Sequence, residues 1–179
     1  MPGCRNVSSA LVAGLVLLRL CVSSSIADAV DDHRRATLKG LTGVNVAVEI
    51  LDPEIERAGL MREQLQTAAE LKLRQSAIHV LTDEERFKIP GKPFLYVNLQ
   101  TYQQKENKNL VFFHFQVQLK QDVLLARDNT PSVATVTWET PQRLGVVGIS
   151  KVRDLRAVII DDVERFCNEY LTVNPNPEK

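Results

Sequence analysis

The sequence predicts an α+β fold: a two-layer sandwich in which a mainly antiparallel sheet of about five strands carries two helices on one face. Several segments alternate apolar and polar residues, which is the period of a half-buried strand. Two others repeat apolar residues at helical spacing. Because no strand reads as a continuous apolar run, a parallel sheet buried on both faces is not expected. The expected element order is β-α-β-β-β-β-α.

The strands alternate most regularly in the middle of the chain. Strands are expected at residues 44–50, 78–81, 94–100, 113–125 and 133–138, and helices at residues 61–75 and 150–171. Turn-rich residues 105–109 and 127–131 join antiparallel neighbours. In the last strand, the alternation places Ala134, Val136 and Trp138 on the buried side.

The closing helix carries a long apolar stripe. Gly145 and Gly148 are interpreted as a break after the sheet, and Ser150 as the N-cap of the helix. The stripe consists of Val152, Leu155, Ile159, Val163, Phe166 and Tyr170. Such a stripe predicts that this side of the helix packs on the sheet.

The amino-terminal residues have the order of a secretory signal peptide. One cation, Arg5, precedes the run Leu11–Val22, which is apolar except for Arg19, and Ala27-Asp28-Ala29 offers small residues for cleavage. The predicted organisation is a signal peptide over residues 1–29, a flexible mature N-terminus over 30–40, a single α+β domain over 41–173 and a tail over 174–179. We therefore expect a periplasmic or extracellular protein.

Two other uses of this leader remain open. As a transmembrane anchor, the apolar run is short, because ~12 residues rising ~1.5 Å each span roughly 18 Å of the ~30 Å of bilayer hydrocarbon. We therefore expect no transmembrane anchor after cleavage. As a lipoprotein signal, Cys21 is preceded by Leu20 where a small residue is usual.

Composition narrows the classes of partner. The chain has 179 residues, with 22 basic and 22 acidic side chains, so it lacks the basic excess of a nucleic-acid-binding protein. Cleavage would leave Cys167 as the only cysteine, so no intrachain disulfide is expected. We expect another envelope protein as partner and no nucleic acid.

The chemically reactive residues do not form a recognisable catalytic or metal motif. His33, His79 and His114 lack metal-ligand spacing, so neither a metal nor a cofactor is expected. Cys167 is interpreted as a half-buried packing residue. Asp161, Asp162 and Glu164 are interpreted as a solvated helix face, and Thr82 with Glu85 as a capping box.

The polar face of the sheet is the candidate interaction surface. Its residues are Asn45, Glu49, Tyr96, Asn98, Gln100, His114, Gln116, Gln118, Lys120, Thr135 and Thr137. A smaller basic cluster, Arg143, Lys151, Arg153 and Arg156, surrounds the start of the closing helix. We expect a non-catalytic binding or assembly module. Two alternatives stay open: an enzyme whose site gathers His114, Tyr96 or Glu49 from distant positions, and a small lipid or ligand carrier.

Some stretches resemble known proteins. Residues 71–78 ahead of Phe94-Leu95-Tyr96-Val97, and the closing residues 166–171, resemble exported bacterial proteins of unknown role. In architecture, the expected fold is similar to small periplasmic α+β modules such as the amino-terminal domain of the Tol-system β-propeller protein. This resemblance implies an envelope location and a role in protein contacts. It carries over no functional residue.

Overall fold

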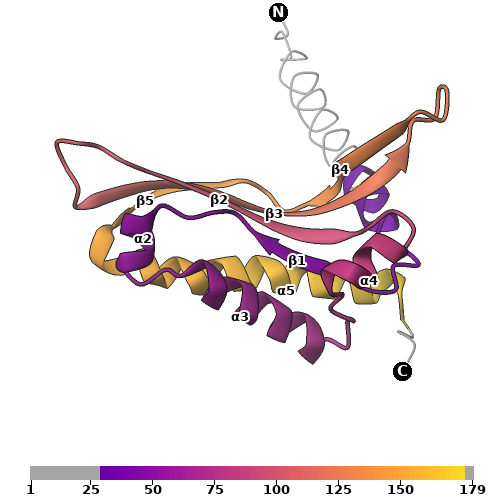
Figure 1. The fold of residues 1–179 in the computed structure, drawn as a ribbon, viewed down its shortest axis with the longest axis horizontal. Coiled ribbons are helices and arrows are strands. Elements are labelled where there is room, and N and C mark those ends of the chain that lie inside the picture. Colours follow the sequence, from indigo (N-terminus) through magenta and orange to yellow (C-terminus); the bar gives the residue numbers. More distant parts are fainter. Residues whose placement is uncertain (1–28, 176–179) are drawn as a thin grey trace, which may run out of the picture.

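The structure, a computed structural model, describes residues 29–175. The strands are β1 (Asn45–Val48), β2 (Phe94–Gln103), β3 (Leu110–Leu124), β4 (Pro131–Glu139) and β5 (Arg143–Gly148). The helices are α2 (Pro53–Arg57), α3 (Arg62–Gln75), α4 (Asp83–Lys88), the 3-10 segment η1 (Ile149–Asp154) and α5 (Leu155–Val173); residues 29–36 are also helical. The predicted α+β class with a mainly antiparallel sheet is confirmed (Figure 1). The predicted signal peptide up to Asp28 lies outside the described residues.

The sheet is organised around the long strand β3. β2 pairs with β3 along its length in antiparallel fashion, and β1 pairs with β2 in parallel. On its other side, β3 pairs with β5 over its first half and with β4 over its second half. β4 and β5 therefore follow one another along a single edge of the sheet, separated by Thr140 and the residues after it.

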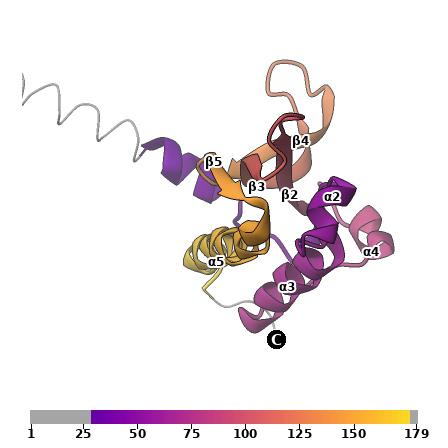
Figure 2. The ribbon, with the colours of Figure 1, turned by 90° about the vertical axis from the view of Figure 1, so that its left-hand side faces the viewer.

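Both long helices lie on one face of the sheet. Figure 1 shows α3 and α5 beneath the strands, and Figure 2, turned by 90°, shows them beside each other. Phe166 of α5 is fully buried, and its ring packs edge-on against Trp138 of β4 with centroids 5.2 Å apart. The predicted stripe of the closing helix is confirmed, because each of its six members is buried, Val152 in η1 and the other five in α5. Burial of these apolar residues is the main force that joins the two layers.

Two predicted features of the sheet are wrong. Residues 78–81 do not form a strand, since only Val80 bridges to Val44. Gly145 and Gly148 do not mark a break but belong to strand β5. Gly145 is required there because a Cβ at this position would lie 2.6 Å from the Phe113 ring. An aromatic ring that covers a glycine on the neighbouring strand stabilises such a strand despite the weak intrinsic preference of glycine for strands.

Two further predictions, the facing of Val136 and the start of the closing helix, are also wrong. Trp138 is buried, but a bulge in β4 pairs Lys120 with Val136, so Val136 points to the opposite face and is 39% exposed. Ser150 is not the N-cap of α5, because the chain first makes the 3-10 turn of η1 and α5 begins at Leu155. The predicted capping box between Thr82 and Glu85 is confirmed at the start of α4.

The two ends of the domain are fastened to each other. Leu38 is fully buried, and Asn174 accepts a hydrogen bond from the Gly40 N–H at 2.8 Å and donates one to the Leu38 carbonyl at 2.9 Å. The Tyr170 hydroxyl donates to the Leu41 carbonyl at 2.8 Å. Residues 38–40 and Asn174 therefore pack on the domain, although the predicted bounds placed them in a flexible segment over 30–40 and a tail over 174–179. Residues 176–179 of that tail lie outside the described residues.

Candidate interaction surface

One face of the sheet carries no helix from residues 41–175, and we call it the uncovered face (Figures 1 and 2). Paired residues of neighbouring strands point to the same face, so the register assigns side chains to it. The register places there Asn45, Tyr96, Asn98, Gln100, His114, Gln116, Gln118 and Lys120, from the predicted polar set. These residues run along β2 and β3 in adjacent rows.

At one end of this face, three side chains interact closely. The Tyr96 hydroxyl donates to the Glu49 carboxylate, and the Lys120 ammonium lies 3.9 Å from the centre of the Tyr96 ring. Desolvation, together with the bond to the Glu49 carboxylate and its charge, raises the pKa of Tyr96 to about 12. The phenol therefore stays protonated at neutral pH, and Glu49 and Tyr96 hold each other in place.

In the middle of the face, Gln116 does not form part of an accessible surface. Gln116 is only 4% exposed, and its amide donates to the Thr140 carbonyl at 2.7 Å. The buried Thr140 hydroxyl in turn accepts from the Val117 N–H at 3.0 Å. These bonds close the gap between β4 and β5, so the predicted contact role of Gln116 is replaced by a structural one.

Thr135 and Thr137 are also placed differently from the prediction. The bulge in β4 pairs Thr135 with Gln121, on the face opposite to Lys120. The Thr137 hydroxyl accepts a hydrogen bond from the Gln121 amide at 2.8 Å. Neither threonine joins the row of polar side chains on β2 and β3.

The other end of the uncovered face is apolar, and sequence reasoning missed it. Tyr102 of β2 pairs with Phe112 of β3, which pairs with Val146 of β5, and Leu110 and Leu144 flank this row. We call these five residues the apolar strip. Their exposed fractions are 64% for Tyr102, 38% for Phe112, 52% for Val146, 40% for Leu110 and 76% for Leu144. Strand β5 was not predicted, which is why two of the five side chains went unrecognised.

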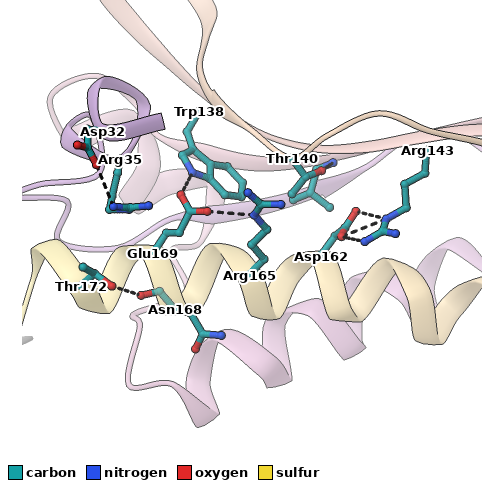
Figure 3. A network of polar contacts seen from close by, with 11 residues as sticks. Asp32, Arg35, Trp138, Thr140, Arg143, Asp162, Arg165, Asn168, Glu169 and Thr172 are labelled. Carbon is teal, nitrogen blue, oxygen red and sulfur yellow. Dashed lines mark hydrogen bonds and ion pairs between the residues drawn. The ribbon is translucent and has the colours of Figure 1, made fainter. Parts of the chain in front are cut away.

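An ion pair between the half-exposed Arg143 and the buried Asp162 fixes β5 to α5, and it corrects the predicted solvated role of Asp162 (Figure 3). The Asp162 side chain is 2% exposed and lies 2.7 Å from Nη2 of Arg143. This bond raises the pKa of the Arg143 guanidinium. Further along α5, Glu169 accepts from Nε1 of Trp138 at 2.7 Å and from Nε of Arg165 at 3.0 Å. The bonds of Asp162 to Arg143 and of Glu169 to Trp138 are structural, since they join α5 to the sheet, and the bond from Arg165, which lies within α5, orients Glu169.

Two residues of the predicted basic cluster line a groove on the side of the molecule away from the uncovered face. Arg153 and Arg156 contribute to a cavity of about 630 Å³ between α3 and α5, together with Leu71 and Ile160. Arg143 is held by Asp162 instead, so the predicted basic cluster does not act as one unit. Lys151 is exposed.

Of the three groups expected for an enzyme, Tyr96 and Glu49 are in contact, but His114 does not join them. Tyr96 and His114 lie on rows that are four residues apart along β2, which is roughly 13 Å. The space between helices and sheet is filled by the apolar core. Cys167 is buried among these residues, more deeply than predicted, and burial raises the pKa of its thiol. Within residues 29–175, no cluster of three or more His, Cys, Asp or Glu side chains could hold a metal ion.

No helix in the described part of the chain is long and apolar enough to span a bilayer. The chain was also compared with models of protein families and with characterised proteins. Neither comparison finds a match.

Proposed function

We propose that this chain is an exported bacterial envelope protein that acts as a non-catalytic binding or assembly module through the uncovered face of its sheet. The observation that carries the proposal is the apolar strip. Apolar patches of roughly 300–600 Å² are the largest on a typical soluble protein and often mark a contact site. A strip with five large apolar side chains on three adjacent strands is of this kind.

The neighbouring polar rows fit the same role. Gln100 and His114 border the strip, with Asn98 one row further along β2. An apolar centre with a polar rim is the usual anatomy of a protein interface. The strip therefore supplies the area that excludes water, and the rim supplies directional hydrogen bonds.

Export rests on the leader and on the architectural resemblance. The order of charge, apolar run and small residues over residues 1–29 is typical of a cleaved signal. N-terminal sequencing of the protein from an exporting bacterium should begin at Val30, with no lipid on Cys21. Recovery of the chain in the cytoplasm with Met1 intact would contradict the proposed location.

The binding surface is tested by photocrosslinking in the exporting cell. Benzoylphenylalanine at Phe112 should give a discrete adduct with another envelope protein, identified by mass spectrometry, and Leu144→Lys should abolish it. The same reagent at Leu71, which is 52% exposed on α3, is the matched control. Equal adduct yields from both positions, or no adduct from position 112, would contradict the proposal.

A further inference from the structure

The edges of the sheet differ in how they are protected. At β1, the Val44 N–H donates to the His79 carbonyl at 3.0 Å and Arg62 donates to the Val48 carbonyl at 3.0 Å. At β4, Thr37 donates to the Thr137 carbonyl at 3.1 Å. β4 also begins with a proline and contains bulges. Natural proteins use such contacts, prolines and bulges to prevent edge-to-edge pairing.

Among residues 29–175, strand β5 has none of these devices. Its sequence after Arg143 is Leu-Gly-Val-Val-Gly, without a proline or a charged side chain. Arg143 itself is drawn to Asp162 on α5. β5 is therefore an apolar edge that lacks the usual protection against strand pairing.

The hydrogen-bonding groups of this edge can be assigned. The Ile149 N–H donates to the Asn109 carbonyl at 2.8 Å, which makes these two residues a hydrogen-bonded pair. Bonded and non-bonded pairs alternate along an antiparallel ladder. Leu144 and Val146 are therefore non-bonded positions relative to β3, so their N–H and C=O groups point outward from the sheet.

The apolar strip of one copy is smaller than the area that a standard interface buries on each partner, and the strips of two copies together are large enough. With roughly 150–250 Å² for a fully exposed large side chain, the exposed fractions give on the order of 500 Å² of strip per copy. A standard interface buries about 800 Å² on each partner. A single strip falls short of this area. Two strips that meet across paired β5 edges form a continuous surface on the order of 1,000 Å², which is sufficient.

The edge is also complementary to itself. An antiparallel pair centred on Gly145 sets Leu144 opposite Val146 of the second copy, and each outward N–H faces an outward carbonyl. The two Gly145 residues meet at a close non-bonded position, where the absence of a side chain avoids a clash. Arg143 comes opposite Val147 of the second copy, so no like charges oppose each other across the strand pair.

We propose that β5 pairs with β5 of a second copy and that this dimer completes the docking surface. The proposal rests on the proposed function for the use of the apolar strip. The pairing itself stands on the edge alone, and its test needs no other protein.

The test is sedimentation equilibrium of the mature chain at several concentrations. The wild-type chain should dimerise reversibly. Leu144→Lys, which places a charge beside the two-fold axis, and Val146→Pro, which removes an outward N–H, should each raise the dimer dissociation constant at least tenfold. Val133→Lys is the matched control, because Val133 is 73% exposed on β4, and it should dimerise like the wild type. Circular dichroism confirms that each variant is folded, and either β5 variant alone is sufficient for the test.

The outcomes separate the two proposals. A wild-type chain that stays monomeric at about 100 µM, or folded β5 variants that dimerise normally, would overturn the pairing. If position 112 still crosslinks to another protein in that case, the proposed function stands without the dimer. If the chain forms a dimer that depends on β5 but position 112 gives no adduct with another protein, the pairing is supported and the proposed function is contradicted.

Discussion

Arg143 and Asp162 connect the edge strand to the long helix through three hydrogen bonds. The Arg143 guanidinium donates from Nη2 at 2.7 Å and from Nε at 3.1 and 3.3 Å to the two carboxylate oxygens. Asp162 is almost fully buried, whereas Arg143 is half exposed. The pair fixes the position of β5, and with it the outward direction of Leu144 and Val146.

Arg143→Met should destabilise the domain by about 2–4 kcal/mol, because it leaves a buried carboxylate without a partner. Arg153→Met is the matched control. Arg153 and Asp154 are both exposed and 3.8 Å apart, so its loss should cost less than about 0.5 kcal/mol. Urea unfolding gives both values. Equal losses would show that the Asp162 carboxylate is not held by Arg143.

Thr140→Val should destabilise the domain by about 1–3 kcal/mol. The substitution keeps the shape of the side chain but leaves the buried Val117 N–H without the Thr140 hydroxyl as acceptor. Thr67→Val provides the comparison, since Thr67 is exposed on α3 and its hydroxyl donates to the Glu63 carbonyl of the same helix. Urea midpoints that agree between the two variants would contradict the role of Thr140 in joining β4 to β5.

Phe166→Ala should cost roughly 3–5 kcal/mol, because it leaves a cavity beside Trp138 in the centre of the core. Glu164→Ala lies on the same helix, and Glu164 is half exposed and paired with Lys72 at 2.9 Å. Its loss should cost less than about 1 kcal/mol. A stable Phe166→Ala variant in thermal or urea unfolding would be incompatible with α5 as a core helix.

Alkaline pH should weaken the fold through Tyr96. Its pKa is raised from an ordinary value near 10 to about 12 in the folded chain. Its stabilising contribution is therefore complete below pH 10 and is lost as the pH rises from about 10 to 12. Urea midpoints measured between pH 8 and 11 should fall more steeply for the wild type than for Tyr96→Phe. Glu49→Gln removes the negative charge but keeps an acceptor, so its slope should lie between them; identical slopes for all three chains would remove the role of Glu49.

Periodicity predicted the parts of the fold that are controlled by burial on one side. The stripe of the closing helix and the alternation of β3 are of this kind. In a strand the odd or even position of a residue, and in a helix its angle around the axis, determines whether the side chain faces the core. The bulge at Thr137, which turns Val136 to the uncovered face, escaped prediction, since an inserted residue reverses parity without a local sequence signal.

The features of the candidate site that the sequence did not predict depend on contacts between residues that are far apart in the sequence. β5 contains two glycines and reads as a break, and Phe113 of β3 makes Gly145 compatible with a strand. Asp162 reads as solvated, and it is buried because Arg143 approaches from β5. The consecutive Phe112 and Phe113 could have indicated an apolar strip, because in a strand one of two adjacent aromatic residues must face away from the core.

Amide hydrogen exchange of the mature chain, resolved by residue with NMR, tests the β5 edge most directly. The outward N–H groups of Leu144 and Val146 should exchange slowly at high protein concentration, where the chains are paired, and faster on dilution or in Leu144→Lys. The Val147 N–H, which points to β3, should stay protected at every concentration. Fast exchange of Leu144 and Val146 at all concentrations, in a chain whose Val147 N–H is protected, would contradict pairing at this edge.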